Sequence, residues 1–449
     1  MTREEKLERG PIVRTMLAMG IPTFIAQFIN LLYNIVDRIY IGHIPECGAQ
    51  ALTGVGVCFP IITFVSAFTS LMGMGGAPLA GIELGKKERE KAEKILGNSA
   101  SSLVILSVIL MVVFQIIKKP FLFMFGASEA TYVYAGPYLT IYLTGTIFAM
   151  LSIGLNAYIT TQGASVTAML SVIIGAVVNM ILDPIFIFGL NLGVQGAAIA
   201  TVISQAISAI WVLAFLFGKK ATLRLRVKYM IPDIKIIGKI CSLGISPFIM
   251  GATESLISVI FNSGAQKFGG DLYVGSITIL QSVMQIVSIP LNGFASGVVP
   301  IISYNYGAKN MQRVKKTALT LIGITFSVSA VLTLIAMFIP ESMASLFTTD
   351  KELVRLCGKV MPVFMSGMLI FGLQSGSQNS FMALGKAKQS LFFALLRKVI
   401  LLSPLAIILP RVMDSVMGIY YAEPISDVTS ALCCFTVFII TLKKEMKEK

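Results

Sequence analysis

Charged residues are scarce in this sequence. They make up 13% of its 449 residues, against roughly 25% in an ordinary soluble domain. A chain with so little charge cannot cover a surface in water, which argues against a soluble protein. Hydrophobic residues make up 55% of the chain, and the mean hydropathy is +0.83. Apolar windows of about 20 residues recur along it, and each could cross a bilayer as a helix whose backbone groups bond within the segment.

Residues that bind metals or catalyse reactions are also few. His43 is the only histidine, which excludes a metal site or a proton relay built from several histidines. No P-loop, GxSxG or HExxH pattern occurs, so we expect neither an enzyme nor a bound cofactor. The cysteines show no metal or disulfide spacing, and we interpret them as small apolar fillers: Cys47, Cys58, Cys241, Cys357, Cys433 and Cys434. The charged start of the chain, residues 1–14, does not resemble a cleavable signal peptide.

Twelve apolar segments are predicted to span the membrane as helices. This predicts an all-α membrane protein with an N-terminal six-helix bundle (1–217), a cytoplasmic linker (218–240) and a C-terminal six-helix bundle (241–449). The predicted spans lie at 15–38, 52–78, 95–117, 130–155, 164–188, 194–217, 241–263, 274–300, 316–339, 354–380, 389–409 and 418–441.

The net charge of +14 is explained by topology. If the N-terminus lies in the cytoplasm, 26 of the 36 lysine and arginine residues fall in the segments on that side. This is the positive-inside bias. We therefore expect both termini in the cytoplasm of a prokaryotic cell membrane, a lipid bilayer as the surroundings, and no nucleic-acid partner. We expect the protein to be a monomer.

The two halves of the sequence repeat each other at an offset of about 222 residues. Because each half holds six spans, both enter the membrane in the same direction, and the repeats are parallel. In such folds the substrate binds between the repeats near the midplane, and the halves rock to expose it alternately. The matched positions include Pro78 with Pro300, Gly85 with Gly307, Gly163 with Gly385, Gly196 with Gly418 and, at an offset of 224, Gly20 with Gly244.

Polar residues inside the first bundle suggest a cation site. Asp37 lies late in the first span with Tyr33 one turn earlier, and Asp183 lies late in the fifth span with Asn179 one turn earlier. Thr201 lies at a similar depth in the sixth span. Oxygen ligands of this kind suit a hard cation such as Na⁺, and two carboxylates in one site could instead share a proton.

A purely structural role for the two aspartates is the alternative. Asp37 could pair with Arg38, although adjacent residues point to different faces of a helix. Asp183 could cap the end of its helix, since Pro184 follows it. For Asp37 the functional interpretation is favoured, and for Asp183 the residues alone leave both open.

The second bundle carries a different set of charges. Glu254 lies in the middle of the seventh span, where nearby Ser and Thr could hold it if it has no function. Arg397 and Lys398 lie in the eleventh span. We predict an ion pair or network of Arg397 with Asp427 or Glu423, because buried charges without partners are very costly. A structural role and substrate recognition are equally compatible with it.

Methionine and phenylalanine are abundant, with 23 and 28 residues. A cavity lined by these residues and a few acids would accept varied lipophilic cations. The alternative, that most of them face lipid or pack between helices, is stronger.

Several stretches together resemble prokaryotic transporters of the multidrug and toxic compound extrusion family. The resemblance covers nearly the whole chain. It is carried by residues 21–22 (Ile-Pro), 32–38 (Leu-Tyr-Asn-Ile-Val-Asp-Arg), 41–42 (Ile-Gly), 179–184 (Asn-Met-Ile-Leu-Asp-Pro), 193–198 (Gly-Val-Gln-Gly-Ala-Ala) and 422–427 (Ala-Glu-Pro-Ile-Ser-Asp).

The resemblance implies a role for each matched residue. Family members bind the coupling cation in the first bundle at positions occupied here by Asp37, Asn179, Asp183 and Thr201, with a tyrosine at Tyr33. Some members couple through acids on helices 7 and 10 instead. Glu254 matches the first of these acids, but around helix 10 this chain has Gln374 and Gln378 and no carboxylate. The second-bundle candidates for substrate contact are therefore Glu254, Gln374, Gln378, Arg397 and Asp427.

The implied function is an antiporter that exports organic cations or amphipathic compounds in exchange for Na⁺ or H⁺. Two other functions remain open. A flippase for lipid-linked sugars of the same superfamily would have a cationic cavity, which the few intramembrane basic residues disfavour. A receptor or scaffold would carry no substrate flux and would not need Asp37.

Overall fold

The computed structural model describes residues 2–45, 47–348 and 350–448, which are almost entirely helical. In these residues ten helices are long and apolar enough to cross a membrane, or up to twelve if each of two bent helix pairs counts as one span. This confirms the predicted fold class of twelve membrane helices.

The first half of the chain forms one bundle. A short helix, α1 (Arg3–Arg9), precedes it. The bundle consists of α2 (Ile12–Gly42), α3 (Gly48–Gly85), α4 (Arg89–Met124), α5 (Glu129–Thr144) with α6 (Thr146–Thr161), α7 (Ser165–Pro184) with the π-helical η1 (Ile185–Gly189), and α8 (Gly193–Phe217). A 3₁₀ turn, η2 (Val227–Tyr229), lies in the connection to the second half.

The second half forms the other bundle. It consists of α9 (Ile234–Gly269), α10 (Asp271–Gly307), α11 (Met311–Phe338), the short α12 (Pro340–Ser345), α13 (Lys351–Met365) with α14 (Met368–Ala383), α15 (Ala387–Leu395) with the π-helical η3 (Leu396–Leu402) and α16 (Ser403–Val412), and α17 (Met417–Glu448). Several helices begin at a side-chain cap of the expected kind, such as Asp233 at α9 and Asp350 at α13.

Two corresponding spans are broken at the same place in each repeat. The α5–α6 pair bends by 55° and the α13–α14 pair by 45°. Gly145 lies at the first break and Gly367 at the second, 222 positions later, and both pack tightly against a neighbouring helix. The sequence predicted one continuous span for each pair, 130–155 and 354–380, because hydropathy carries no information about a bend.

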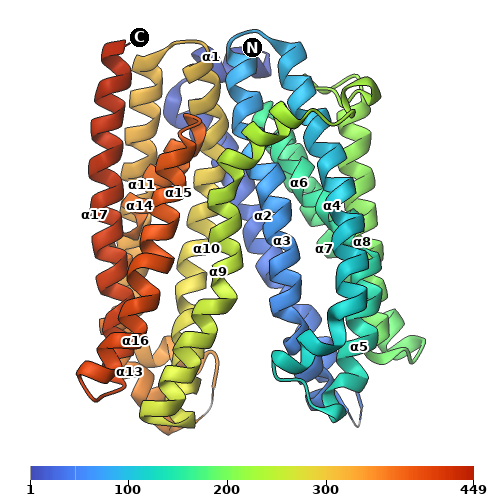
Figure 1. Ribbon diagram of the computed structural model, residues 1–449, viewed down its shortest axis with the longest axis vertical. Coiled ribbons are helices and arrows are strands. Elements are labelled where there is room, and N and C mark those ends of the chain that lie inside the picture. Colours follow the sequence, from blue (N-terminus) through green and yellow to red (C-terminus); the bar gives the residue numbers. More distant parts are fainter. Residues whose placement is uncertain (1, 46, 349, 449) are drawn as a thin grey trace.

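The two halves meet along two seams near the end of the molecule that carries both termini, called here the terminal end. Helix α3 packs along α9, and α2 along α10. Figure 1 shows the ribbons of the two halves diverging toward the opposite, far end. At the terminal end Gly85 abuts the carbonyl of Tyr304, and Gly307 abuts that of Ile82. The offset of 222 residues relates Gly85 to Gly307 and Ile82 to Tyr304, so the repeats face each other through equivalent positions.

A bulkier residue at Gly244 should open the α3–α9 seam. A Cβ there would lie 1.9 Å from the carbonyl oxygen of Leu71, too close for any side chain. Gly244→Val is therefore expected to raise, several-fold, the rate at which a maleimide reaches a cysteine placed at the buried Ser303 in a cysteine-free background. Gly323→Val is the matched control, because a Cβ at Gly323 meets nothing within 4 Å. Equal labelling of the two variants would show that the seam tolerates the change.

Helix α1 bridges both halves at the terminal end. Leu7 is buried, and Glu8 pairs with Lys87 at 3.1 Å. On the other side Asn305 donates to the carbonyl of Leu7 at 2.9 Å, and Arg313 donates to the same carbonyl at 3.1 Å.

The linker between the halves, residues 218–233, lies on the first bundle. Gln162 accepts hydrogen bonds from the backbone of Thr222 at 2.6 Å and of Leu223 at 3.1 Å. Buried Glu93 pairs with Arg226 at 2.8 Å. Asn98 accepts from the backbone N–H of Asp233 at 2.6 Å.

Candidate functional site

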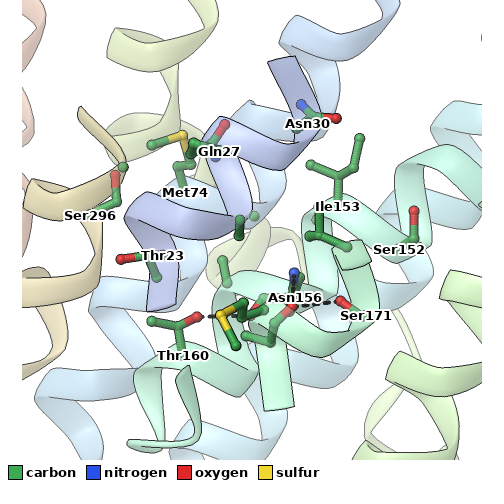
Figure 2. A pocket seen from close by; sticks show the side chains of 18 of the residues that line it. Thr23, Gln27, Asn30, Met74, Ser152, Ile153, Asn156, Thr160, Ser171 and Ser296 are labelled. Atoms are coloured by element: carbon green, nitrogen blue, oxygen red, sulfur yellow. Dashed lines mark hydrogen bonds between the residues drawn. The ribbon is translucent and has the colours of Figure 1, made fainter. Parts of the chain in front are cut away.

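A cavity of about 360 Å³ lies inside the first bundle. On the side that faces the second bundle, it is closed by residues of α10 and α14. This central cavity has the size of an ordinary small-molecule site. Figure 2 shows Thr23, Gln27 and Asn30 of α2 on one side, Ser152, Asn156 and Thr160 of α6 with Ser171 of α7 on another, and Ser296 of α10 across from them.

The lining of the central cavity is polar but uncharged. Nearly half of the lining residues carry a hydroxyl or amide group, and the described lining contains no Asp, Glu, Lys or Arg. Three methionines are present (Met74, Met169 and Met382), but Tyr33 is the only aromatic residue in the described lining. The described lining contains no phenylalanine. This agrees with the interpretation that most phenylalanines face lipid or pack between helices.

The structure brings together the polar residues predicted in the first bundle. Asn179 and Asp183 of α7 are fully buried, and the Asn179 amide donates to Asp183 at 3.0 Å. The same amide group lies 3.5 Å from the Thr201 hydroxyl of α8. Asp37 reaches this group from α2, and its carboxyl group is close enough to that of Asp183 for direct interaction.

The oxygen atoms at this site suit a bound cation. Asp37 Oδ1, Asp183 Oδ2 and Asn179 Oδ1 are buried and accept no hydrogen bond from the described residues. Unpaired buried oxygens are costly, and two adjacent carboxyl groups repel each other when both are ionised. A Na⁺ ion or a proton would relieve both costs.

Two structural alternatives for the aspartates fit the structure less well. Asp183 does not cap a helix end, because η1 carries the helix on to Gly189. The Arg38 guanidinium lies over the ring of Phe59, 4.3 Å from its centroid, and interacts with Asp37 electrostatically. Arg38 is therefore shared between the ring and the carboxylate and does not pair with Asp37 alone.

Three residues near this site were missed by the sequence analysis. Tyr138 and Tyr142 of α5 lie close enough to Asp37 to interact with it electrostatically, and the side chain of Gln205 of α8 lies next to Tyr142. Gln205 also lines the central cavity, as does Tyr33. Their spacing could have identified them, because Tyr142 lies one helical turn after Tyr138, and Gln205 one turn after Thr201, on the same helix face. These residues join the candidate cation site to the cavity.

The second bundle contains a buried ion network. Arg397 lies in η3 and donates through Nε to Asp427 at 2.6 Å, while its NH2 group lies 3.4 Å from Glu423. The Phe371 ring covers the guanidinium at 4.7 Å. The predicted contacts of Arg397 with Asp427 and Glu423 are therefore present.

Glu254 has a partner that the sequence did not suggest. Its carboxylate accepts from Lys398 at 2.9 Å. The Lys398 side chain is 6% exposed, whereas that of Glu254 is 46% exposed. The Ser258 hydroxyl donates to the Glu254 backbone carbonyl and not to its carboxylate, so this bond does not hold the side chain as the alternative interpretation expected.

Gln374 and Gln378 are buried between helices. Gln374 accepts from the Ser430 hydroxyl at 2.7 Å, and Gln378 donates to Ser246 at 3.0 Å. The described lining of the central cavity includes Asn379 and Met382 of the same helix, but none of the five second-bundle candidates.

Known proteins resemble this chain over nearly its full length. The multidrug export protein MepA of Staphylococcus haemolyticus (strain JCSC1435) is 26% identical over 436 residues, which cover 96% of this chain and 94% of that protein. MepA of Staphylococcus aureus (strain MSSA476) is 24% identical with the same coverage.

Solved structures share the fold. A crystal structure of a MATE protein in the bent conformation gives a TM-score of 0.92 at 22% identity, covering 100% of this chain and 99% of that one. An outward-facing multidrug resistance MATE family transporter of the MOP superfamily gives 0.92 at 22%, with 99% of each chain covered.

A family model described as MatE matches residues 22–185 and 248–408. These ranges include Asp37, Asn179 and Asp183 of the candidate cation site and Arg397 of the ion network, but not Thr201, Glu423 or Asp427. Together with the twelve-helix, two-bundle fold, this match shows that the chain belongs to the MatE family, that of the multidrug and toxic compound extrusion transporters.

Proposed function

We propose that this protein is a secondary antiporter that exports organic cations or other amphipathic compounds in exchange for Na⁺ or H⁺. The observation that carries the proposal is the group of unpaired buried oxygens on Asp37, Asp183 and Asn179, joined to the central cavity through Tyr33 and Gln205. The multidrug export proteins that the chain resembles support it.

The positive-inside bias makes the terminal end cytoplasmic. Closed seams at that end are those expected of a state closed to the cytoplasm, and in the proposed cycle this state exchanges ligands with the outside. In this state a cation enters from outside and binds between Asp37 and Asp183. The substrate is released because the cation-bound protein binds it more weakly, since a ligand shifts an equilibrium only through differential affinity.

Return to the state open to the cytoplasm requires the two halves to separate along the α3–α9 and α2–α10 seams. The uncharged lining of the central cavity does not favour the lipid-linked sugar flippase, for which a cationic cavity was expected.

Transport by purified protein in proteoliposomes tests this function. A Na⁺ gradient and a pH gradient are imposed separately, and efflux of the cationic dye rhodamine 6G and of radiolabelled chloramphenicol, an uncharged compound, is measured. We expect at least one gradient to drive efflux of at least one probe above the rate of protein-free liposomes. Efflux that no gradient changes would contradict an ion-coupled antiporter and favour the receptor or scaffold.

A further inference from the structure

We propose that the central cavity selects uncharged amphipathic molecules that carry hydroxyl or amide groups, in preference to organic cations. The inference rests on the proposed function, because it specifies the substrate class of the exporter. It follows from the chemistry of the cavity wall and from the pairing of the acidic groups in the rest of the membrane region.

The described wall offers an organic cation no carboxylate and only one aromatic ring. A buried cation needs a carboxylate or the face of an aromatic ring nearby. The described lining has no charged side chain, and its one aromatic ring, Tyr33, lies at the end next to the candidate cation site.

Acidic side chains within the spans of the second bundle are paired with basic side chains outside the central cavity. Asp427 and Glu423 face Arg397, and Glu254 is bound by Lys398. Asp37 and Asp183 face each other, and neither belongs to the described lining of the central cavity. A cationic substrate in the central cavity would therefore find no available carboxylate among the described residues of its wall.

Uncharged hydrogen-bonding groups do find partners there. Asn156 and Gln205 line the cavity, and their side-chain oxygens are buried and accept no hydrogen bond from the described residues. Gln27 and Asn30 of α2 are exposed toward the same space, and both offer a donor and an acceptor. Hydroxyl and amide groups of a ligand can satisfy these atoms without bringing a charge into the cavity.

Chloramphenicol and its deacylated amine form a matched pair of probes. They share the nitrophenyl ring and both hydroxyl groups, but the amide of the first is replaced by an ammonium group in the second. Binding is measured by equilibrium dialysis of radiolabelled chloramphenicol with the full-length protein in detergent, using each compound as competitor. No ion gradient is present, so a failure of ion-coupled transport would not affect this result.

We expect saturable chloramphenicol binding and at least tenfold weaker competition by the amine. Asn30→Asp places a carboxylate in the wall and should shift the preference toward the amine by at least tenfold, whereas Asn30→Gln should keep the wild-type preference. Gln27→Glu is the second variant if Asn30→Asp does not fold.

Two results would overturn the proposal. The first is that the amine competes for the wild-type protein as well as chloramphenicol does. The second is that chloramphenicol shows no saturable binding. The protein could prefer chloramphenicol over the amine while neither the Na⁺ nor the pH gradient drives export. That result would support the proposed substrate class of the cavity and refute the proposed antiport.

Discussion

Ion-driven export by the Asp37→Asn variant should fall to the rate of protein-free liposomes. Asparagine keeps the size of the side chain but removes the charge that attracts Na⁺ or carries the proton. The remaining ligands are Asp183, Asn179 and Thr201, of which only one is charged, so cation affinity drops sharply. Without differential cation binding, an ion gradient cannot bias the cycle.

The same variant should remain folded. Asp37 and Asp183 lie close together, so neutralising one removes a repulsion, and the thermal unfolding temperature should not fall. Asn34→Ala, one turn away on α2, is a matched control that should keep wild-type export. Wild-type export by folded Asp37→Asn protein would refute the assignment of this residue to coupling.

Arg397→Met should be among the most destabilising substitutions in the second bundle. Removing one partner of a buried ion pair strands the remaining charge, which costs about 3–5 kcal/mol. Here two acids, Asp427 and Glu423, lose their partner, and both are buried. Midpoints of unfolding by sodium dodecyl sulfate, measured in mixed micelles, should show a loss of this size relative to wild type.

Two further variants separate charge from packing. The double variant Arg397→Met/Asp427→Asn should recover part of the loss, because one stranded charge is then gone. Lys398→Met should cost less than Arg397→Met, since its partner Glu254 is half exposed. An Arg397→Met protein as stable as wild type would mean that the two acids find another cation or are already neutral.

Hydropathy and the repeat predicted the number and direction of the spans, but not their internal shape. The apolar windows at 130–155 and 354–380 are continuous in composition, yet the chain breaks near Gly145 and Gly367. At the second break Gly367 lies against Pro424 of α17, with no room for a side chain between them. Such contacts between distant parts of the chain leave no local pattern in the sequence.

Some features of the candidate sites could likewise be predicted from the sequence, and others could not. Asp37, Asn179, Asp183 and Thr201 were found because polar residues at similar depth in apolar spans are conspicuous. The Lys398–Glu254 pair was missed because adjacent residues of an α-helix point about 100° apart, and Arg397 had already been assigned inward. The π-helical η3 widens the helix at this point, and both cations are buried there with partners on different helices.

The linker also determines how the two halves can move. Its hydrogen bonds to Gln162, Glu93 and Asn98 make it part of the first bundle. Asp233 then belongs to both halves, because Asn98 holds its backbone N–H while its carboxylate caps α9. The connection is therefore short and anchored at Asp233, and α1 ties the two halves together at the same end of the molecule. When the halves separate in the proposed cycle, residues near these anchors should move least, and the largest displacements are expected at the far end of the molecule.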